Sequence, residues 1–225
     1  MPVATTVRDL SPACQDYLRT VYVLAGAEER VTTSALADRM GVTAPSATAM
    51  AKRLAAMGLV ERIPYRGLTL TDEGRRVALE LLRHHRLIER YLSDTLGLPL
   101  DAVHDEADRL EHALSEELEA RIDERLGFPT TDPHGDPIPD RDLRLAPVGE
   151  RRTLAQLGPG ERATVTAVPD RDPALLRYLG DLALVPSGRV TAVLAAPFDG
   201  PVTLDTASGR HAISRDLAAS ISIAS

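Results

Sequence analysis

The chain has 225 residues, a formal net charge of −7 and a single cysteine, Cys14. That length is enough for two domains with a core each. A lone cysteine excludes an intramolecular disulfide and a zinc site made of several thiolates. The sequence has no apolar run of about 18 residues and no basic start followed by an apolar core, so we expect a cytoplasmic protein without membrane contact.

The charge is unevenly distributed along the chain. Between Val31 and Arg66 there are five basic and two acidic residues, whereas between Asp101 and Glu124 there are ten acidic and two basic ones. An acidic protein is a poor general ligand for nucleic acid, because phosphate contact needs a positive surface. We therefore expect the first segment to contact DNA and the second to hold a cation.

Apolar periodicity predicts three helices in the first third of the chain, at about 13–27, 33–40 and 45–57. Thr32 or Thr33 caps the second, and Pro45 falls in the first turn of the third, where its missing N–H costs nothing. The two are joined by the Gly41–Ala44 turn. A helix, a glycine-containing turn and a second helix predict a helix-turn-helix, whose last helix enters the major groove.

The next segment predicts a hairpin followed by two long helices. Val60–Ile63 and Leu68–Leu70 flank a bend at Pro64–Gly67, which is typical of the wing of a winged helix. Thr71 caps a helix to about Leu96. A further helix is expected over about 101–126. Its predicted buried positions are Val103, Ala107, Leu110, Leu114, Leu118 and Ile122.

Composition changes after these helices. Five prolines lie between positions 129 and 147, which is typical of a linker, and short β-branched runs after Thr153 predict a small β-barrel. The predicted fold is mainly α with β. Its expected parts are a winged helix-turn-helix domain (1–72), a helical dimerisation and metal-binding domain (73–128), a Pro-rich linker (129–150) and the barrel (151–225).

Histidines and carboxylates recur at helical spacing in two segments. His85 and Glu89 are four residues apart, as are His104 and Asp108, and such residues share a face of a helix. Asp108 likewise lies beside Glu111 and His112. Ionisable groups at the edge of an apolar stripe must be paired or metal-bound, and this mixture of donors suits a first-row divalent metal.

The chain resembles the diphtheria toxin repressor family of iron- and manganese-dependent transcriptional repressors. The resemblance is carried by five segments of the sequence: Asp16–Thr20, Arg83–Glu89, Val103–Ala107, Glu111–His112 and Gly135–Pro139. It implies the order winged helix, dimerisation domain, Pro-rich segment and SH3-like (FeoA-type) barrel. It also implies a DNA-binding repressor of metal-homeostasis genes that has no enzymatic activity and no organic cofactor.

The resemblance implies a first metal site made by Asp16, Asp108, Glu111 and His112. Iron-dependent members of the family have methionine and cysteine where this chain has Asp16 and Asp108, whereas manganese-dependent members have carboxylates. Hard oxygen ligands suit Mn(II), so we expect Mn(II), with Fe(II) as the alternative.

A second site is implied at His85, Glu89 and His104, which gives two metal ions per subunit. Asp170 and Asp172 are the nearest carboxylates of the barrel, and Asp172 is the fourth candidate ligand. In some relatives an anion lies beside this site, at positions that match Arg86, Asp132 and Asp136. Two acids would repel an anion, so we expect Arg86 to pair with these carboxylates.

The implied partner is double-stranded DNA with a palindromic operator, bound by a homodimer. The candidate DNA contacts on and beside the third helix and in the wing are Thr43, Pro45, Ser46, Thr48, Lys52 and Arg66. A metal-dependent hydrolase and a dimer that senses an organic ligand are the other classes considered. The first leaves the winged helix unexplained, and the second leaves the His and Glu pairs unexplained.

Overall fold

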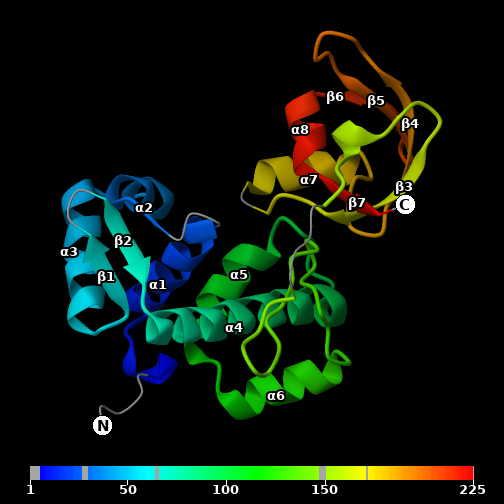
Figure 1. Ribbon diagram of the computed structural model, residues 1–225. Coiled ribbons are helices and arrows are strands. Elements are labelled where there is room, and N and C mark those ends of the chain that lie inside the picture. The colour runs from blue at the N-terminus through cyan, green and yellow to red at the C-terminus, as the bar shows by residue number, and fades with distance from the viewer. Residues whose placement is uncertain (1–5, 27–29, 64–65, 147–150, 171, 225) are drawn as a thin grey trace. The chain divides into compact units, whose positions relative to one another are not determined.

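The computed structural model describes residues 6–26, 30–63, 66–146, 151–170 and 172–224 (Figure 1). The chain forms two compact units. The first unit comprises Met1–His85, Glu111–Leu114 and Pro139–Leu145, and the second comprises Arg86–Leu110, Ser115–Ile138 and Ala146–Ser225. Each unit is described by itself below.

The first unit contains the predicted winged helix. After a 3-10 turn, η1 (Val7–Asp9), it has three helices, α1 (Pro12–Ala25), α2 (Thr33–Met40) and α3 (Ala44–Ala56), and a hairpin of β1 (Val60–Ile63) and β2 (Gly67–Leu70). The strands are antiparallel, with Val60 opposite Leu70. Thr32 and Thr43 cap α2 and α3 by accepting hydrogen bonds from backbone N–H groups, as their side chains predict. Pro64 and Tyr65 of the predicted bend lie outside the described residues.

The core of this unit lies between the three helices and the hairpin. Leu18, Leu36, Leu54 and Leu68 are fully buried there, and α1 packs against α2, α3 and β2. The helix α4 (Asp72–Leu96) begins at its predicted cap, where Thr71 Oγ1 accepts from the Gly74 N–H at 3.0 Å. Helix α1 therefore carries one face into the core that also positions α3.

The predicted helix over 101–126 is wrong in one respect, because the chain is broken in its middle. It forms α5 (Val103–Leu110), a 3-10 turn η3 (Glu111–Ala113) and α6 (Glu116–Arg125). Ser115 starts the new helix by accepting from the Leu118 N–H at 3.2 Å. Val103, Ala107 and Ile122 are buried as predicted, whereas Leu110 and Leu118 are 47% and 49% exposed.

The segment predicted as a linker is partly an ordered loop of the second unit. Thr131 pairs with Pro137 as an isolated bridge, and the Val168 N–H donates to the His134 carbonyl at 2.9 Å. A Cβ added at Gly135 would lie 1.9 Å from the Thr166 carbonyl oxygen, and its φ of 95° suits glycine. Glycine is thus required where the loop touches the barrel.

The rest of the second unit is the small barrel. Its five antiparallel strands are β3 (Arg162–Ala167), β4 (Arg189–Ala195), β5 (Val202–Thr206), β6 (Gly209–Ile213) and β7 (Ser222–Ala224), in the order β6-β5-β4-β3-β7. The strands predicted from the β-branched runs Ala163–Val168, Arg189–Leu194 and Val202–Leu204 correspond to β3, β4 and β5. Five elements of the barrel were not predicted: β6, β7, the helices α7 (Pro173–Asp181) and α8 (Arg215–Ser220), and the 3-10 turn η4 (Leu154–Gln156).

No helix in the described ranges has both the length and the apolar character that crossing a bilayer requires.

Candidate metal centres and nucleic-acid interface

The first cluster lies within the first unit and joins α1 to η3. Asp16 comes from α1, and Glu111 and His112 come from η3; their ligand atoms all lie within 4.8 Å of one another. Two oxygens and one nitrogen at this separation can coordinate one divalent cation. The break between α5 and α6, which was not predicted, therefore places Glu111 and His112 opposite α1.

His112 is held in one orientation by Gln15. The Gln15 amide nitrogen donates to the carbonyls of Val7 and Leu10 at 3.0 and 3.1 Å, so its oxygen faces His112. His112 Nδ1 lies 2.8 Å from that oxygen and must donate to it. The other ring nitrogen, Nε2, lies 3.2 Å from Asp16 Oδ1. Two lone pairs would face each other there unless a proton or a cation lay between them.

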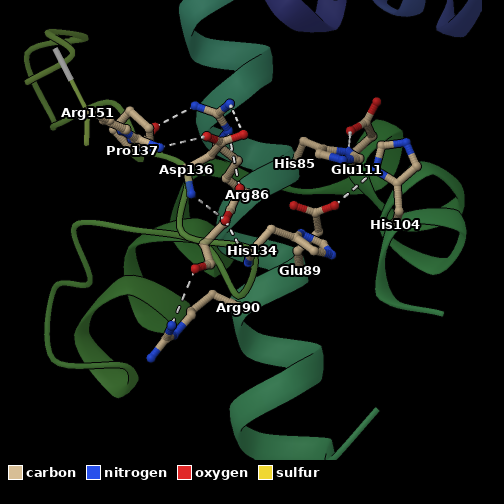
Figure 2. A network of polar contacts seen from close by, with 11 residues as sticks. His85, Arg86, Glu89, Arg90, His104, Glu111, His134, Asp136, Pro137 and Arg151 are labelled. Atoms are coloured by element: carbon tan, nitrogen blue, oxygen red, sulfur yellow. Dashed lines mark hydrogen bonds and ion pairs between the residues drawn. The ribbon is translucent and has the colours of Figure 1, made fainter. Parts of the chain in front are cut away.

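Glu111 has one oxygen bonded and one oxygen without a hydrogen bond. His85 Nδ1 lies 2.7 Å from Oε2, and both side chains are buried (Figure 2). Oε1 is buried and accepts no hydrogen bond; Arg19 Nη2 lies 3.5 Å from it. A buried carboxylate oxygen that lacks a hydrogen bond is costly, and it is suited to bind a cation.

Asp108, the fourth predicted ligand of this site, lies on α5 in the second unit. Its carboxylate is 3.9 Å from His104 Nε2, one helical turn earlier. Its role as a ligand of the first ion stays a prediction.

The second cluster lies within the second unit and consists of Glu89, Asp132 and His134. All three are buried, and their ligand atoms lie within 4.8 Å of one another. Glu89 is on α4 and the other two are on the 130–138 loop. His104 Nδ1 lies 3.0 Å from Glu89 Oε1, so this predicted ligand contacts the cluster through Glu89 (Figure 2).

His134 has a defined tautomer. Its Nε2 lies 3.1 Å from the Leu100 carbonyl, to which it must donate, so Nδ1 carries a lone pair. Nδ1 is buried and has no hydrogen-bond partner. A metal-binding imidazole usually donates its other N–H to a carbonyl or carboxylate in this way. The donors present at this cluster therefore fit a divalent ion.

Asp132 is fixed by the loop and by Arg86. Its Oδ1 accepts from the backbone N–H groups of His134 and Asp136, both at 2.9 Å. Burial is the main cause that raises the pKa of Asp132 to about 7, and the nearby Glu89 charge adds to it, while the Arg86 charge opposes it. The ion would replace the proton that this site otherwise favours.

Arg86 pairs with carboxylates, which confirms the expectation from the sequence. It lies 3.5 Å from Asp132 Oδ2 and 3.5 Å from Asp136 Oδ2, and it donates to the Pro137 carbonyl at 2.5 Å (Figure 2). Arg151 lies 3.6 Å from the other oxygen of Asp136. The two acids that would repel an anion are thus neutralised within the unit.

Asp172 has a structural role in the described chain. It is exposed and caps α7 by accepting from the Ala174 N–H at 2.8 Å, so its assignment to the second site stays a prediction. His134 and Asp132 were not predicted as ligands. The signal was available in Asp132-Pro133-His134-Gly135, a carboxylate and an imidazole two residues apart in a turn-forming segment.

Most of the candidate DNA contacts lie on an exposed surface of α3 and the hairpin. Thr43, Pro45, Ser46, Lys52 and Arg66 are exposed and Thr48 is half-buried, whereas Ala47, Ala51 and Leu54 of α3 are buried in the core. Beside the wing a cavity of about 460 Å³ is lined by Thr32–Ser34 of the α2 N-terminus together with Arg62 and Arg66. Hydroxyls and arginines of this kind suit phosphate contact.

Comparisons with known proteins cover the whole described order of domains. Residues 9–68 match the model of the iron dependent repressor N-terminal DNA binding domain, 71–140 that of its metal binding and dimerisation domain, and 152–225 the FeoA domain. The chain is 37% identical over 198 residues to the iron-dependent repressor IdeR of Mycobacterium leprae, which covers 82% of this chain and 85% of that one.

A second relative, the diphtheria toxin repressor of Corynebacterium efficiens, is 41% identical over 135 residues, which span 59% of this chain and 58% of the relative. Among solved structures, a manganese-dependent transcriptional repressor in complex with manganese has a TM-score of 0.81 at 38% identity and covers 94% of this chain and 99% of its own. The manganese regulator SloR has a TM-score of 0.74 at 30% identity, over 96% and 99% of the two chains.

Proposed function

We propose that Mn(II) is the ion sensed by this chain, which belongs to the iron-dependent (diphtheria toxin) repressor family and is a metal-dependent transcriptional repressor. The single observation that carries the proposal is the approach of His112 Nε2 to Asp16 Oδ1 at 3.2 Å, with the opposite nitrogen committed to Gln15. The lone pairs of His112 Nε2 and Asp16 Oδ1 would repel each other, so a positive charge is needed between these two atoms.

The choice of Mn(II) over Fe(II) rests on the donor atoms. Neither described cluster contains sulfur, and Cys14 is buried in the core of the first unit, where it contacts Met50. Carboxylate oxygen with one or two imidazoles suits Mn(II), whereas thiolate or thioether would favour later metals. The manganese complex among the similar structures supports the same choice for this chain.

Asp16 connects the first site to the DNA-reading surface. It lies on α1, whose neighbouring residues Tyr17, Leu18 and Val21 are buried in the core shared with α3. A bound divalent ion supplies the positive charge that allows Asp16 and Glu111 to remain close. Because Asp16 and His112 are then tied together, α1 is held to η3 and the mobility of α3 decreases. Metal affinity and DNA affinity are therefore thermodynamically coupled.

We propose Glu89, Asp132 and His134 as the holders of a second ion per subunit, with His104 oriented toward Glu89. The support is the buried, unpartnered Nδ1 of His134. Asp132 and His134 belong to the loop that packs on the barrel, so an ion there would stabilise the fold of the second unit.

The DNA-bound form is proposed to be a homodimer on a palindromic operator in the cytoplasm. The matching family model is a metal binding and dimerisation domain, and the second unit exposes large apolar side chains over that region. They are Leu96, Leu110, Leu118 and Phe128. Burying them against a second copy would remove apolar surface from water, and the resulting dimer would carry two copies of α3 to a palindromic operator.

The test is a titration of metal-free protein with Mn(II) followed by electron paramagnetic resonance, combined with a gel shift on the operator. We expect two bound ions per subunit and operator binding that needs Mn(II). His112→Ala should abolish one ion and metal-dependent DNA binding, whereas Arg121→Ala on α6, a residue paired only with Glu117 in the described chain, should change neither. Operator binding that survives a chelator would refute the proposal.

Fe(II) is the second candidate ion, because relatives such as the Mycobacterium leprae protein are iron-dependent repressors. Parallel anaerobic titrations with Fe(II) decide between the two. Operator binding activated by Fe(II) but not by Mn(II) would favour iron.

A further inference from the structure

We propose that the outer face of the barrel carries a binding site for a phosphate group. The site is formed by Arg162 and Thr164 of β3 together with Arg189 and Thr191 of β4, which line a cavity of about 440 Å³. It shares no residue with the two metal clusters or with the surface of α3 and the hairpin. It therefore adds a ligand to those of the proposed function and does not depend on them.

The four side chains share one face because β3 and β4 are neighbouring antiparallel strands (Figure 1). Ala163 and Val190 are buried in the barrel core, so the residues that flank them on each strand point to the opposite, outer face. Arg162 and Arg189 are exposed on that face, and each lies opposite a half-buried threonine of the other strand. The arginines are thus diagonal neighbours, which in such a pair of strands are about 7–8 Å apart.

The charges of these two arginines are not balanced by acids. Between residues 151 and 224 the other five arginines that the structure describes each have an acidic partner. These pairs are Arg151–Asp136, Arg152–Glu161, Arg177–Asp101, Arg210–Asp205 and Arg215–Asp199. The side chains of Arg162 and Arg189 form no ion pair or hydrogen bond with any residue in the described ranges. The barrel therefore presents two cations at one cavity without a counter-charge of its own.

An anion between the two guanidinium groups would replace their mutual repulsion by attraction. Guanidinium donates paired N–H bonds to phosphate or carboxylate. The hydroxyls of Thr164 and Thr191, which make no hydrogen bond within the described chain, supply two further donors. A carboxylate has two oxygens, which one guanidinium can satisfy, whereas a phosphate group presents at least three acceptor oxygens. Two arginines and two hydroxyls around one cavity therefore suit phosphate better.

The experiment uses the metal-free full-length protein, because phosphate also binds Mn(II). Isothermal titration calorimetry with inorganic phosphate, at constant ionic strength set by chloride, measures the site itself. The variants are Arg162→Gln, Arg189→Gln and the double substitution, with Thr164→Val to remove one hydroxyl at nearly constant volume. Arg121→Gln on α6 is the matched control, since it removes an exposed arginine elsewhere in the second unit. Circular dichroism melting verifies that every variant is folded.

We expect saturable binding of inorganic phosphate. Each single arginine substitution should raise the dissociation constant about tenfold, as the loss of one hydrogen bond between charged groups predicts, and the double substitution should abolish binding. Thr164→Val should have a smaller effect, and Arg121→Gln should have none.

A second measurement identifies where the phosphate group comes from. Fluorescence anisotropy with a duplex that lacks the operator compares the wild type with the double variant. Weaker duplex binding and a smaller dependence on salt in the double variant would assign the phosphate to the nucleic-acid backbone. Unchanged duplex binding, with inorganic phosphate binding lost, would assign it to a small phosphorylated molecule.

The proposal would be overturned by the absence of saturable phosphate binding, or by binding that the double substitution leaves intact, which would place the ion elsewhere on the protein. Equal weakening by Arg121→Gln would overturn it as well, because the effect would then come from net charge. None of these results bears on metal-dependent repression, since no metal ligand is changed.

Discussion

The Nδ1–H of His112 donates to Oε1 of Gln15 at 2.8 Å, and this bond decides which ring nitrogen faces Asp16. Gln15→Leu removes the acceptor, so we expect the Mn(II) dissociation constant of the first site to rise about 10–100-fold. It also removes two buried bonds to the Val7 and Leu10 carbonyls, at a cost in unfolding free energy of roughly 2 kcal/mol.

Gln15→Glu is the matched control for this prediction. It loses the same two donated bonds and turns a carboxylate oxygen toward the two carbonyls, so stability should fall at least as far as in Gln15→Leu. It keeps an oxygen toward His112, so Mn(II) affinity should be largely retained. Urea denaturation and Mn(II) titration of both variants make the comparison. If affinity fell equally in both, His112 would not be oriented by Gln15.

Arg86 gives a prediction about the stability of the ligand-bearing loop. Arg86→Gln leaves Asp132 buried beside Glu89 without its compensating cation, and we expect a loss of roughly 3 kcal/mol in unfolding free energy. Adding Asp136→Asn should recover part of that loss, because one of the two carboxylates near Arg86 is then uncharged. A double-mutant cycle by urea denaturation measures the coupling. Strictly additive effects would contradict the network.

The winged helix could be predicted from the sequence because the residues that start its helices and form its turns act locally. Thr32, Thr43 and Thr71 stand at helix starts, Pro45 lies in a first turn, and Gly41 lies in the turn between α2 and α3 with φ of 63°. Each of these signals acts within a few residues. Such signals therefore do not depend on how distant parts of the chain pack.

The candidate sites could be predicted only in part, because spacing along a helix groups residues of one element alone. It grouped His104 with Asp108, which the structure keeps 3.9 Å apart, and His85 with Glu89. The structure instead joins His85 to Glu111 and Glu89 to His134 and Asp132, which come from other segments. The break at Ser115 also depends on a single cap in a strongly helical run, so periodicity passed over it.

Two glycines give a matched pair of stability predictions. A Cβ at Gly74 would lie 1.8 Å from the Leu59 carbonyl oxygen, so Gly74→Ala forces α4 away from the hairpin and should cost more than about 2 kcal/mol. Gly180 lies in α7 with no atom within 4 Å of an added Cβ, and Gly180→Ala should stabilise by roughly 0.5–1 kcal/mol. Thermal melting distinguishes the two. A Gly74→Ala protein as stable as the wild type would contradict the close packing.

If α3 and the wing bind DNA, removal of their basic side chains should change the salt dependence of DNA affinity. Lys52 and Arg66 are exposed, and each is expected to contact a phosphate. Alanine at either position should weaken binding to all sequences and reduce the slope of log affinity against log salt by about one per site contacted. Ser46→Ala should instead relax sequence preference with the slope unchanged. Fluorescence anisotropy across salt concentrations, with Arg121→Ala as the control, makes the measurement. A slope unaffected by both basic substitutions would place the DNA elsewhere.

Asp132 makes the stability of the metal-free protein depend on pH. Burial raises its folded-state pKa to about 7 from the ordinary value of 3.8, so between these pH values the folded form holds a proton that the unfolded form has lost. The stability due to this group is therefore fully present below about pH 4 and is lost as pH rises through 7. The side chain of Asp132→Asn cannot titrate. The difference in unfolding free energy between the wild type and this variant should therefore change between pH 4 and pH 8.

Saturating Mn(II) should reverse this trend in the wild type, because a cation beside Asp132 favours the deprotonated carboxylate. Urea denaturation at pH 5 and pH 8, with and without Mn(II), tests both parts. A wild type whose metal-free stability follows Asp132→Asn at every pH would show that Asp132 is ionised in the folded chain and would remove the basis for the trend. Metal that stabilises the wild type more at pH 5 than at pH 8 would contradict competition between the ion and the proton.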